Sequence, residues 1–167
     1  LHECEAGTVY GSDGFWLSRS GEELYDQARG YGARGVNWLK IRVSSDPWVR
    51  TRDRLRAVVE GHGAGRAGND RAPVLLLDAF QSLNVQETLE LTQQLADSSL
   101  PVAWLEDPLP KFSFDGYRRL DRSRVGLPLV SGESLSLSHS IRSLLDTDSL
   151  SILMLDLQRV GGINGWI

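Results

Sequence analysis

The 167-residue sequence predicts an α/β fold of the TIM-barrel type, in which parallel strands alternate with helices. Short apolar runs typical of buried strands alternate along the chain with segments whose apolar residues have helical spacing. Three of these runs end in a carboxylate, at Asp78, Glu106 and Glu133, and the carboxylates lie 28 and 27 residues apart. Each interval fits one helix and one strand, so we expect an incomplete barrel made of about its first six strands.

The first half of the chain is expected to hold three strands and two helices. We place the strands at residues 8–10, 37–44 and 73–80. The first helix follows Ser20-Gly21-Glu22-Glu23, which matches a capping box. The second follows Asp46-Pro47, an N-cap with proline at the first helical position.

A glycine-rich, charged segment at residues 61–72 contains a G-x-G-x-x-G pattern at Gly63, Gly65 and Gly68, next to His62. The dinucleotide fingerprint needs such glycines after a strand and at the start of a helix. Here they follow a helix and precede a strand, so we expect an exposed connector in place of a nucleotide site.

The second half continues the alternation. We expect strands at 102–106, 128–132 and 151–158, and helices at 85–96 and near 116–120. A further helix is predicted by the spacing of its apolar residues, which are Leu137, Ile141, Leu144 and Leu145.

Composition limits the classes of function and partner. The net charge of −4 gives no reason to expect nucleic acid or an anionic membrane as a partner. Cys4 is the only cysteine, which favours a reducing, cytoplasmic location, and no apolar run reaches membrane-span length. The chain starts without Met and stops where a helix should begin, so we expect a part of a barrel domain that lacks its capping domain and last strands. Open strand edges then favour a homo-oligomer.

The three strand-end carboxylates are the candidate functional site. In a parallel βα barrel the C-terminal strand ends meet at the face where active sites lie. Carboxylates that converge there need a cation between them, and oxygen ligands favour a hard ion such as Mg²⁺. Lys40 and Arg42 share one face of their strand and would place two cations beside this site. The alternative is a strand end with two solvated basic residues.

The predicted sixth strand offers Asp156, five residues before Gly161. From its position, Asp156 could bind a metal, orient a histidine or cap the next helix. His2, His62, His139 and Cys4 have positions that do not indicate a catalytic role.

Taken in order, these residues resemble the enolase superfamily, and more closely the barrel domain of the mandelate racemase and muconate lactonizing enzyme group. The resemblance runs from about residue 10 to the end. It implies that Asp78, Glu106 in Trp-Leu-Glu-Asp-Pro and Glu133 in Ser-Gly-Glu bind Mg²⁺, and that Lys40 and Arg42 occupy the family's K-x-K positions. Asp156 is similar to the aspartate of the mandelate racemase subgroup that supports a catalytic histidine on the next strand.

Two departures bear on the reaction. Arg42 replaces the second lysine of the pattern, and arginine stays protonated, so it suits charge stabilisation better than proton abstraction. Phe80 stands where many members have asparagine. The stretch from Asp78 to Leu83 resembles acid-sugar dehydratases of the rhamnonate type. The resemblance therefore implies a small carboxylate substrate and dehydration to a 2-keto-3-deoxy acid. The alternatives are a racemase or epimerase that uses the same enediolate, and a non-catalytic fragment.

Overall fold

A computed structural model describes residues 9–66, 72–123 and 125–166. Its centre is a six-stranded parallel sheet whose strands lie side by side in chain order, as the sequence predicts. Each strand pairs in parallel with the next, which fits successive βα units that wind in one direction. The strands are β1 (Tyr10–Gly11), β2 (Trp38–Arg42), β3 (Val74–Asp78), β4 (Val102–Glu106), β5 (Leu129–Ser131) and β6 (Ile152–Leu153).

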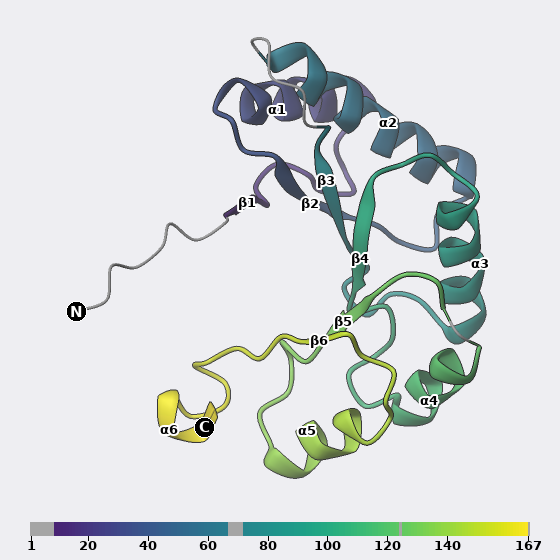
Figure 1. The fold of residues 1–167 in the computed structure, drawn as a ribbon, viewed down its shortest axis with the longest axis vertical. Coiled ribbons are helices and arrows are strands. Elements are labelled where there is room, and N and C mark those ends of the chain that lie inside the picture. The colour runs from purple at the N-terminus through teal and green to yellow at the C-terminus, as the bar shows by residue number, and fades with distance from the viewer. Residues whose placement is uncertain (1–8, 67–71, 124, 167) are drawn as a thin grey trace.

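Helices cover the outer face of this sheet. The curved sheet lies inside an arc formed by α1 to α5, so the described chain forms part of a TIM-type barrel (Figure 1). None of the helices in the described residues is both long and apolar enough to span a membrane. The helices are α1 (Gly21–Ala33), α2 (Trp48–Gly65), α3 (Val85–Ala96), α4 (Phe114–Arg122), α5 (Ser138–Leu145) and α6 (Ile163–Trp166).

The hydrophobic core lies between the sheet and the helices. Leu39 and Ile41 of β2, with Leu75 and Leu77 of β3, belong to it and are fully buried. Because side chains alternate along a strand, the residues between them project from the opposite, inner face. On β2 these are half-buried and include Lys40 and Arg42. The alternation thus sets the two cations on the inside of the curved sheet.

Two helices start with a capping box, which the sequence predicts for the first of them. The Ser20 hydroxyl accepts a hydrogen bond from the backbone amide of Glu23. The Glu23 carboxylate in turn accepts one from the backbone amide of Ser20. Asn84 and Glu87 form the same reciprocal pair at the start of α3. Each capping box satisfies two amides that the first helical turn leaves unpaired.

The cap expected at Asp46 is absent, so that prediction is wrong. The N-cap position of α2 is Pro47, and it carries no side-chain cap hydrogen bond. The Asp46 carboxylate instead accepts from the Ser44 hydroxyl at 2.9 Å and pairs with Arg50 at 3.4 Å. These bonds draw the carboxylate away from the helix amides.

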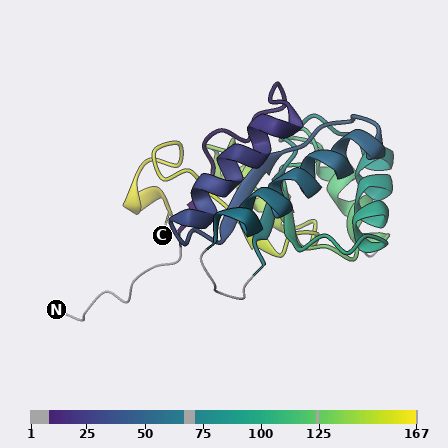
Figure 2. The same ribbon diagram turned by 90° about the horizontal axis from the view of Figure 1, so that it is seen from above.

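The glycine-rich connector also begins later than the sequence predicts, because α2 continues to Gly65. A Cβ at Gly61 would collide with the carbonyl oxygen of Tyr25 in α1, and one at Gly65 with that of Arg29. These glycines let the two helices pack backbone against backbone (Figure 2). This packing outweighs the cost of about 1 kcal/mol for each glycine in a helix.

His62 therefore lies in a helix and not in an exposed connector. It is fully buried, and its Nε2 is 3.1 Å from the carbonyl oxygen of Val36. Residues 67–71 of the predicted connector, with Gly68, lie outside the described residues.

Strand six and the helix before it differ from prediction in extent. β6 spans two residues, because the chain beyond Met154 turns as Asp156 accepts backbone amides. In α5, Leu144 is buried, but Leu145 is 48% exposed. Leu137 is the residue before α5 and is 54% exposed. The apolar face of α5 is therefore narrower than the spacing of its leucines and isoleucine predicts. The α4 helix is longer than expected, and β1 begins two residues later.

Candidate functional site

The predicted site residues of β2, β3 and β4 meet at one edge of the sheet. Arg42 lies beside Asp78, and Asp78 lies beside Glu106, in the pairing of β2, β3 and β4. All three are the last residues of their strands, and Lys40 is two residues before Arg42 on the same face. The parallel register alone therefore places two carboxylates and two cations at the C-terminal edge.

Lys40 links the two carboxylates. Its Nζ donates to Glu106 Oε1 at 3.0 Å and lies 3.3 Å from Asp78 Oδ2. The guanidinium of Arg42 contacts the same Asp78 oxygen. We name Lys40, Arg42, Asp78 and Glu106 the acid–cation cluster. The side chains of Asp78 and Glu106 are 2% and 1% exposed, so the ion pairs lie in a largely desolvated place.

The surroundings shift the pKa of two members of this cluster. Burial alone would lower the pKa of Lys40, but the charges of Glu106 and Asp78 outweigh it and raise the pKa above its usual value. Lys40 is therefore an ammonium ion at neutral pH. Burial raises the pKa of Glu106, and the neighbouring Asp78 carboxylate raises it further, while Lys40 partly opposes both.

Oxygen atoms in the cluster fit a divalent cation. Glu106 Oε2 is buried and has no hydrogen-bond partner. Asp78 Oδ2 is also buried without a hydrogen bond, although both cations lie within ion-pair distance. Buried acceptors are normally satisfied, and carboxylate oxygens are the ligands that Mg²⁺ prefers. Asp78 and Glu106 thus have the chemistry that a metal site needs, and Glu106 Oε2 is free to accept, whereas Asp78 Oδ2 lies against Lys40 and Arg42.

Glu133 lies apart from this pair. It is half-buried and follows Gly132, whose φ of 125° needs glycine. In the part of the chain that the structure describes, no three His, Cys, Asp or Glu side chains are grouped closely enough to hold a metal. The role of Glu133 as the third ligand stays a prediction.

Asp107 is a buried carboxylate that the sequence analysis missed. It is 6% exposed, with a φ of 42°, and its Oδ1 accepts from the Ser131 hydroxyl at 2.6 Å. The Tyr117 hydroxyl donates to the same Ser131 oxygen at 3.0 Å. Burial raises the pKa of Asp107, while the bond from Ser131 opposes the rise. These hydrogen bonds connect the end of β4 to the end of β5, close to Glu133 in the sequence. In the sequence, Asp107 was marked only by its position directly after Glu106.

Asp156 does not join the acid–cation cluster. It is half-buried, its Oδ1 accepts from the Gln158 amide at 2.8 Å, and its Oδ2 pairs with Arg159 at 3.4 Å. Of the roles left open by the sequence, these contacts match capping of the following turn. A catalytic role of Asp156 stays a prediction. His139 is exposed on α5, and Cys4 lies outside the described residues.

Aromatic rings flank Arg42. Its guanidinium lies 4.8 Å from the ring centre of Phe80 and 5.7 Å from that of Trp16. Arg54 of α2 holds the loop of Trp16 by donating to three of its carbonyl oxygens, at 2.8 to 3.2 Å. A largely apolar cavity of about 390 Å³ opens between these rings and Val43. The loop after β1 is thereby fixed next to the cluster.

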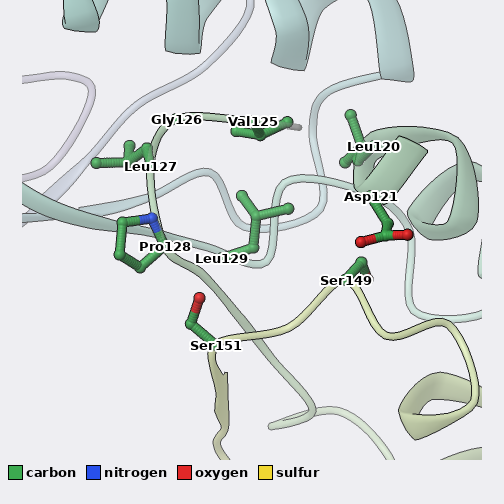
Figure 3. A pocket seen from close by; sticks show the side chains of 9 residues that line it. All are labelled: Leu120, Asp121, Val125, Gly126, Leu127, Pro128, Leu129, Ser149 and Ser151. Carbon is green, nitrogen blue, oxygen red and sulfur yellow. The ribbon is translucent and has the colours of Figure 1, made fainter. Parts of the chain in front are cut away.

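A second cavity, of about 360 Å³, lies at the opposite edge of the sheet (Figure 3). It is formed by Leu120 and Asp121 of α4 and by the start of β5 and β6, including Pro128 and Ser151. Among the nine side chains labelled in Figure 3, Asp121 is the titratable one. Strand starts in a βα barrel serve stability rather than catalysis, so we place the candidate site at the acid–cation cluster.

The fold and the cluster define a class: a parallel βα barrel protein with carboxylates and a lysine at its C-terminal strand edge. The family model described as "Enolase C-terminal domain-like" matches residues 23–167. The chain belongs to this family, which confirms the resemblance seen in the sequence.

Known proteins of this fold include epimerases and dehydratases. L-Ala-D/L-Glu epimerase of Bacillus subtilis (strain 168) is 25% identical over 146 residues, which cover 87% of this chain and 38% of the epimerase. The structure of an enolase from alpha proteobacterium bal199 with bound Mg has a TM-score of 0.79 and 29% identity, over 95% of this chain and 42% of that one. L-Talarate dehydratase from Polaromonas sp. JS666, complexed with Mg and L-glucarate, has a TM-score of 0.79 and 23% identity, over 94% and 41% of the two chains. The chain thus spans about two fifths of the length of these relatives.

Proposed function

We propose that this chain belongs to a Mg²⁺-dependent enzyme that removes the proton α to a substrate carboxylate and dehydrates an acid sugar. The observation that carries the proposal is the acid–cation cluster, in which the Lys40 ammonium bridges the buried carboxylates of Asp78 and Glu106 at the strand edge. Support for the metal comes from the buried, unpartnered Glu106 Oε2 and from relatives whose structures contain Mg. Asp78, Glu106 and Glu133 would hold the ion.

The chemistry needs negative charge to be stabilised as the α-proton leaves. Bound Mg²⁺ would supply Lewis-acid stabilisation of the substrate carboxylate. Lys40 is positively charged at neutral pH and is positioned to donate to oxygens beside the two acids. Arg42 adds a second fixed positive charge. Both side chains therefore stabilise the enediolate electrostatically.

Proton abstraction requires a different group. An ammonium and a guanidinium hold no free electron pair for the α-proton. We assign the base to a histidine that Asp156 orients, as the resemblance to the mandelate racemase subgroup implies. The base takes the α-proton, and the C–H electron pair forms the enediolate. The β-carbon–oxygen bond then breaks, the hydroxyl leaves as water with a proton from a general acid, and the enol product tautomerises to the 2-keto-3-deoxy acid.

The test is Glu106→Gln in the full-length protein, assayed with a panel of acid sugars for release of 2-keto acid. We expect dehydration to fall by at least about 100-fold, since even residues that only support metal ligands cost about 10- to 100-fold. Glu60→Gln, an exposed change on α2, is the matched control. Dehydration of every accepted acid sugar at the control rate would refute the proposal.

An epimerase is the second candidate, favoured by the B. subtilis relative. Both reactions pass through the same enediolate, so the fate of the α-proton distinguishes them. Exchange of this proton with D₂O without loss of water would indicate epimerisation. Loss of water would indicate dehydration. Asp156 speaks against a dipeptide epimerase, because it resembles the mandelate racemase subgroup and the resemblance implies lysine at this position in dipeptide epimerases. It fits a racemase of 2-hydroxy acids as well as a dehydratase, so the fate of the α-proton decides between these two.

A further inference from the structure

Gln81 has an unusual position directly beside the candidate site. It is the third residue after Asp78, and it and Phe80 have positive φ angles of 63° and 48°. Such a conformation is strained for a non-glycine residue and persists where the surroundings fix it. The Gln81 amide donates to the carbonyl oxygen of Asp107 at 2.7 Å, and this bond fixes the loop after β3 to the end of β4.

The side chain of Gln81 reaches two further loops. Its Oε1 accepts from the backbone amide of Lys111 at 3.1 Å, in the loop after β4. Its Nε2 donates to the Ser134 hydroxyl at 2.8 Å, in the loop after β5. The Lys111 amide requires an acceptor, and the Ser134 hydroxyl accepts from a donor. The carboxamide of Gln81 provides both groups at the same time. Gln81 thus connects three successive βα loops.

These loops begin at the three predicted metal ligands. Gln81 follows Asp78, Lys111 follows Glu106, and Ser134 is the next residue after Glu133. The Gln81–Ser134 bond is therefore a direct side-chain connection from the loop of Asp78 to the loop of the half-buried Glu133.

We propose that Gln81 is a positioning residue that fixes the loop of Glu133 beside the loops of Asp78 and Glu106, so that Glu133 can reach a divalent cation bound by the two acids. This inference rests on the metal site of the proposed function. Gln81 itself touches neither metal nor substrate in this role. It acts by fixing the loop after β5, as supporting hydrogen bonds do around metal ligands in other proteins.

The test measures Mg²⁺ binding alone by calorimetry in the full-length protein. Gln81→Leu keeps a side chain of similar size and removes both bonds, and we expect the Kd for Mg²⁺ to rise about tenfold. Ser134→Ala removes one of the bonds and should raise the Kd less. The double variant should bind no more weakly than Gln81→Leu, because both changes break the same connection. Gln86→Leu is the control, since Gln86 is exposed on α3 and its side chain bonds to Glu90 of the same helix.

Thermal unfolding of each variant separates positioning from general stability. A purely structural role would lower the Tm and leave the Kd for Mg²⁺ unchanged, and this outcome would overturn the inference. Additive losses in the double variant would also overturn it. If Gln81→Leu does not fold, Ser134→Ala alone decides between a raised and an unchanged Kd. Absence of Mg²⁺ binding in the unsubstituted protein would overturn the proposed metal site itself, and the role of Gln81 with it.

Discussion

Replacing Lys40 by methionine tests whether the ammonium holds two buried carboxylates together. Methionine keeps an unbranched apolar stem, one atom shorter than the lysine side chain, and removes the charge. At an effective dielectric constant of about 20, unit charges about 3 Å apart interact by roughly 5 kcal/mol. Lys40 Nζ lies 3.0 Å from Glu106 and 3.3 Å from Asp78, and the desolvation of Lys40 offsets part of this attraction. Removal of one partner of a buried ion pair typically lowers the free energy of unfolding by about 3–5 kcal/mol, and we expect Lys40→Met to lower it by this amount at pH 8.

The loss should depend on pH in a defined direction. Burial and Asp78 already raise the pKa of Glu106 in the folded protein, and removal of Lys40 removes the charge that opposes them. The folded state then holds a proton that the unfolded state releases near pH 4.5. Stability therefore falls as the pH rises from this value through the folded pKa. The stability that Lys40→Met loses relative to the unsubstituted protein should be small below pH 4.5 and should reach its full size above the pKa of Glu106 in the folded variant.

Urea denaturation at pH 5 and pH 8, followed by circular dichroism, measures this deficit. Lys111→Met is the matched control, because Lys111 lies in a loop where its ammonium is 4.9 Å from the ring centre of Phe112 and, within residues 9–66, 72–123 and 125–166, forms no ion pair. Added Mg²⁺ should restore part of the stability of Lys40→Met, since the ion replaces the missing positive charge. A Lys40→Met protein as stable as the control at pH 8 would refute the reasoning. A deficit that is the same at both pH values would also refute it.

Two further predictions concern the α1–α2 contact. Gly61→Ala should lower the free energy of unfolding by about 1–3 kcal/mol, because the new methyl group collides with the Tyr25 carbonyl. Gly63 has open space around it, so Gly63→Ala should raise the free energy of unfolding by up to about 1 kcal/mol. Equal denaturation midpoints for the two variants would contradict this. Burial lowers the pKa of His62, so the unfolded state takes up its proton first as the pH falls below about 6.5, and stability should fall by at most about 1.4 kcal/mol per pH unit from there. His62→Gln should remove this part of the pH dependence, and an unchanged slope between pH 6.5 and 5 would show that another group causes it.

The sequence predicted the parts of the site that depend on strand periodicity. Lys40 and Arg42 are two residues apart on one strand, and Asp78 and Glu106 end neighbouring strands, so the regular sheet brings all four together. The fold class followed from the same alternation of strands and helices. Periodicity is a local property, and here the local pattern and the tertiary structure agree.

Predictions failed where a distant part of the chain decides the local structure. Gly61 and Gly65 have a poor intrinsic preference for helix, but contact with α1 keeps them helical. Gln81 bonds to residues 30 and 53 positions away, which no local pattern indicates. Asp107 likewise depends on Ser131, a partner 24 residues further along the chain. The connections that brace the loops are thus the part of the site that sequence patterns leave undetermined.

The alternation of two cations with two carboxylates gives the acid–cation cluster a formal charge of zero. Zinc fingers, whose ligands lack such internal counter-ions, need their metal in order to fold. Here Lys40 and Arg42 are counter-ions that the chain itself supplies, so we expect this part of the barrel to fold without the metal. A divalent ion bound as proposed would compete with Lys40 for the oxygens of Asp78 and Glu106. Metal binding would then be an exchange of one cation for another in a folded protein, and it would release the Lys40 ammonium for contact with a substrate.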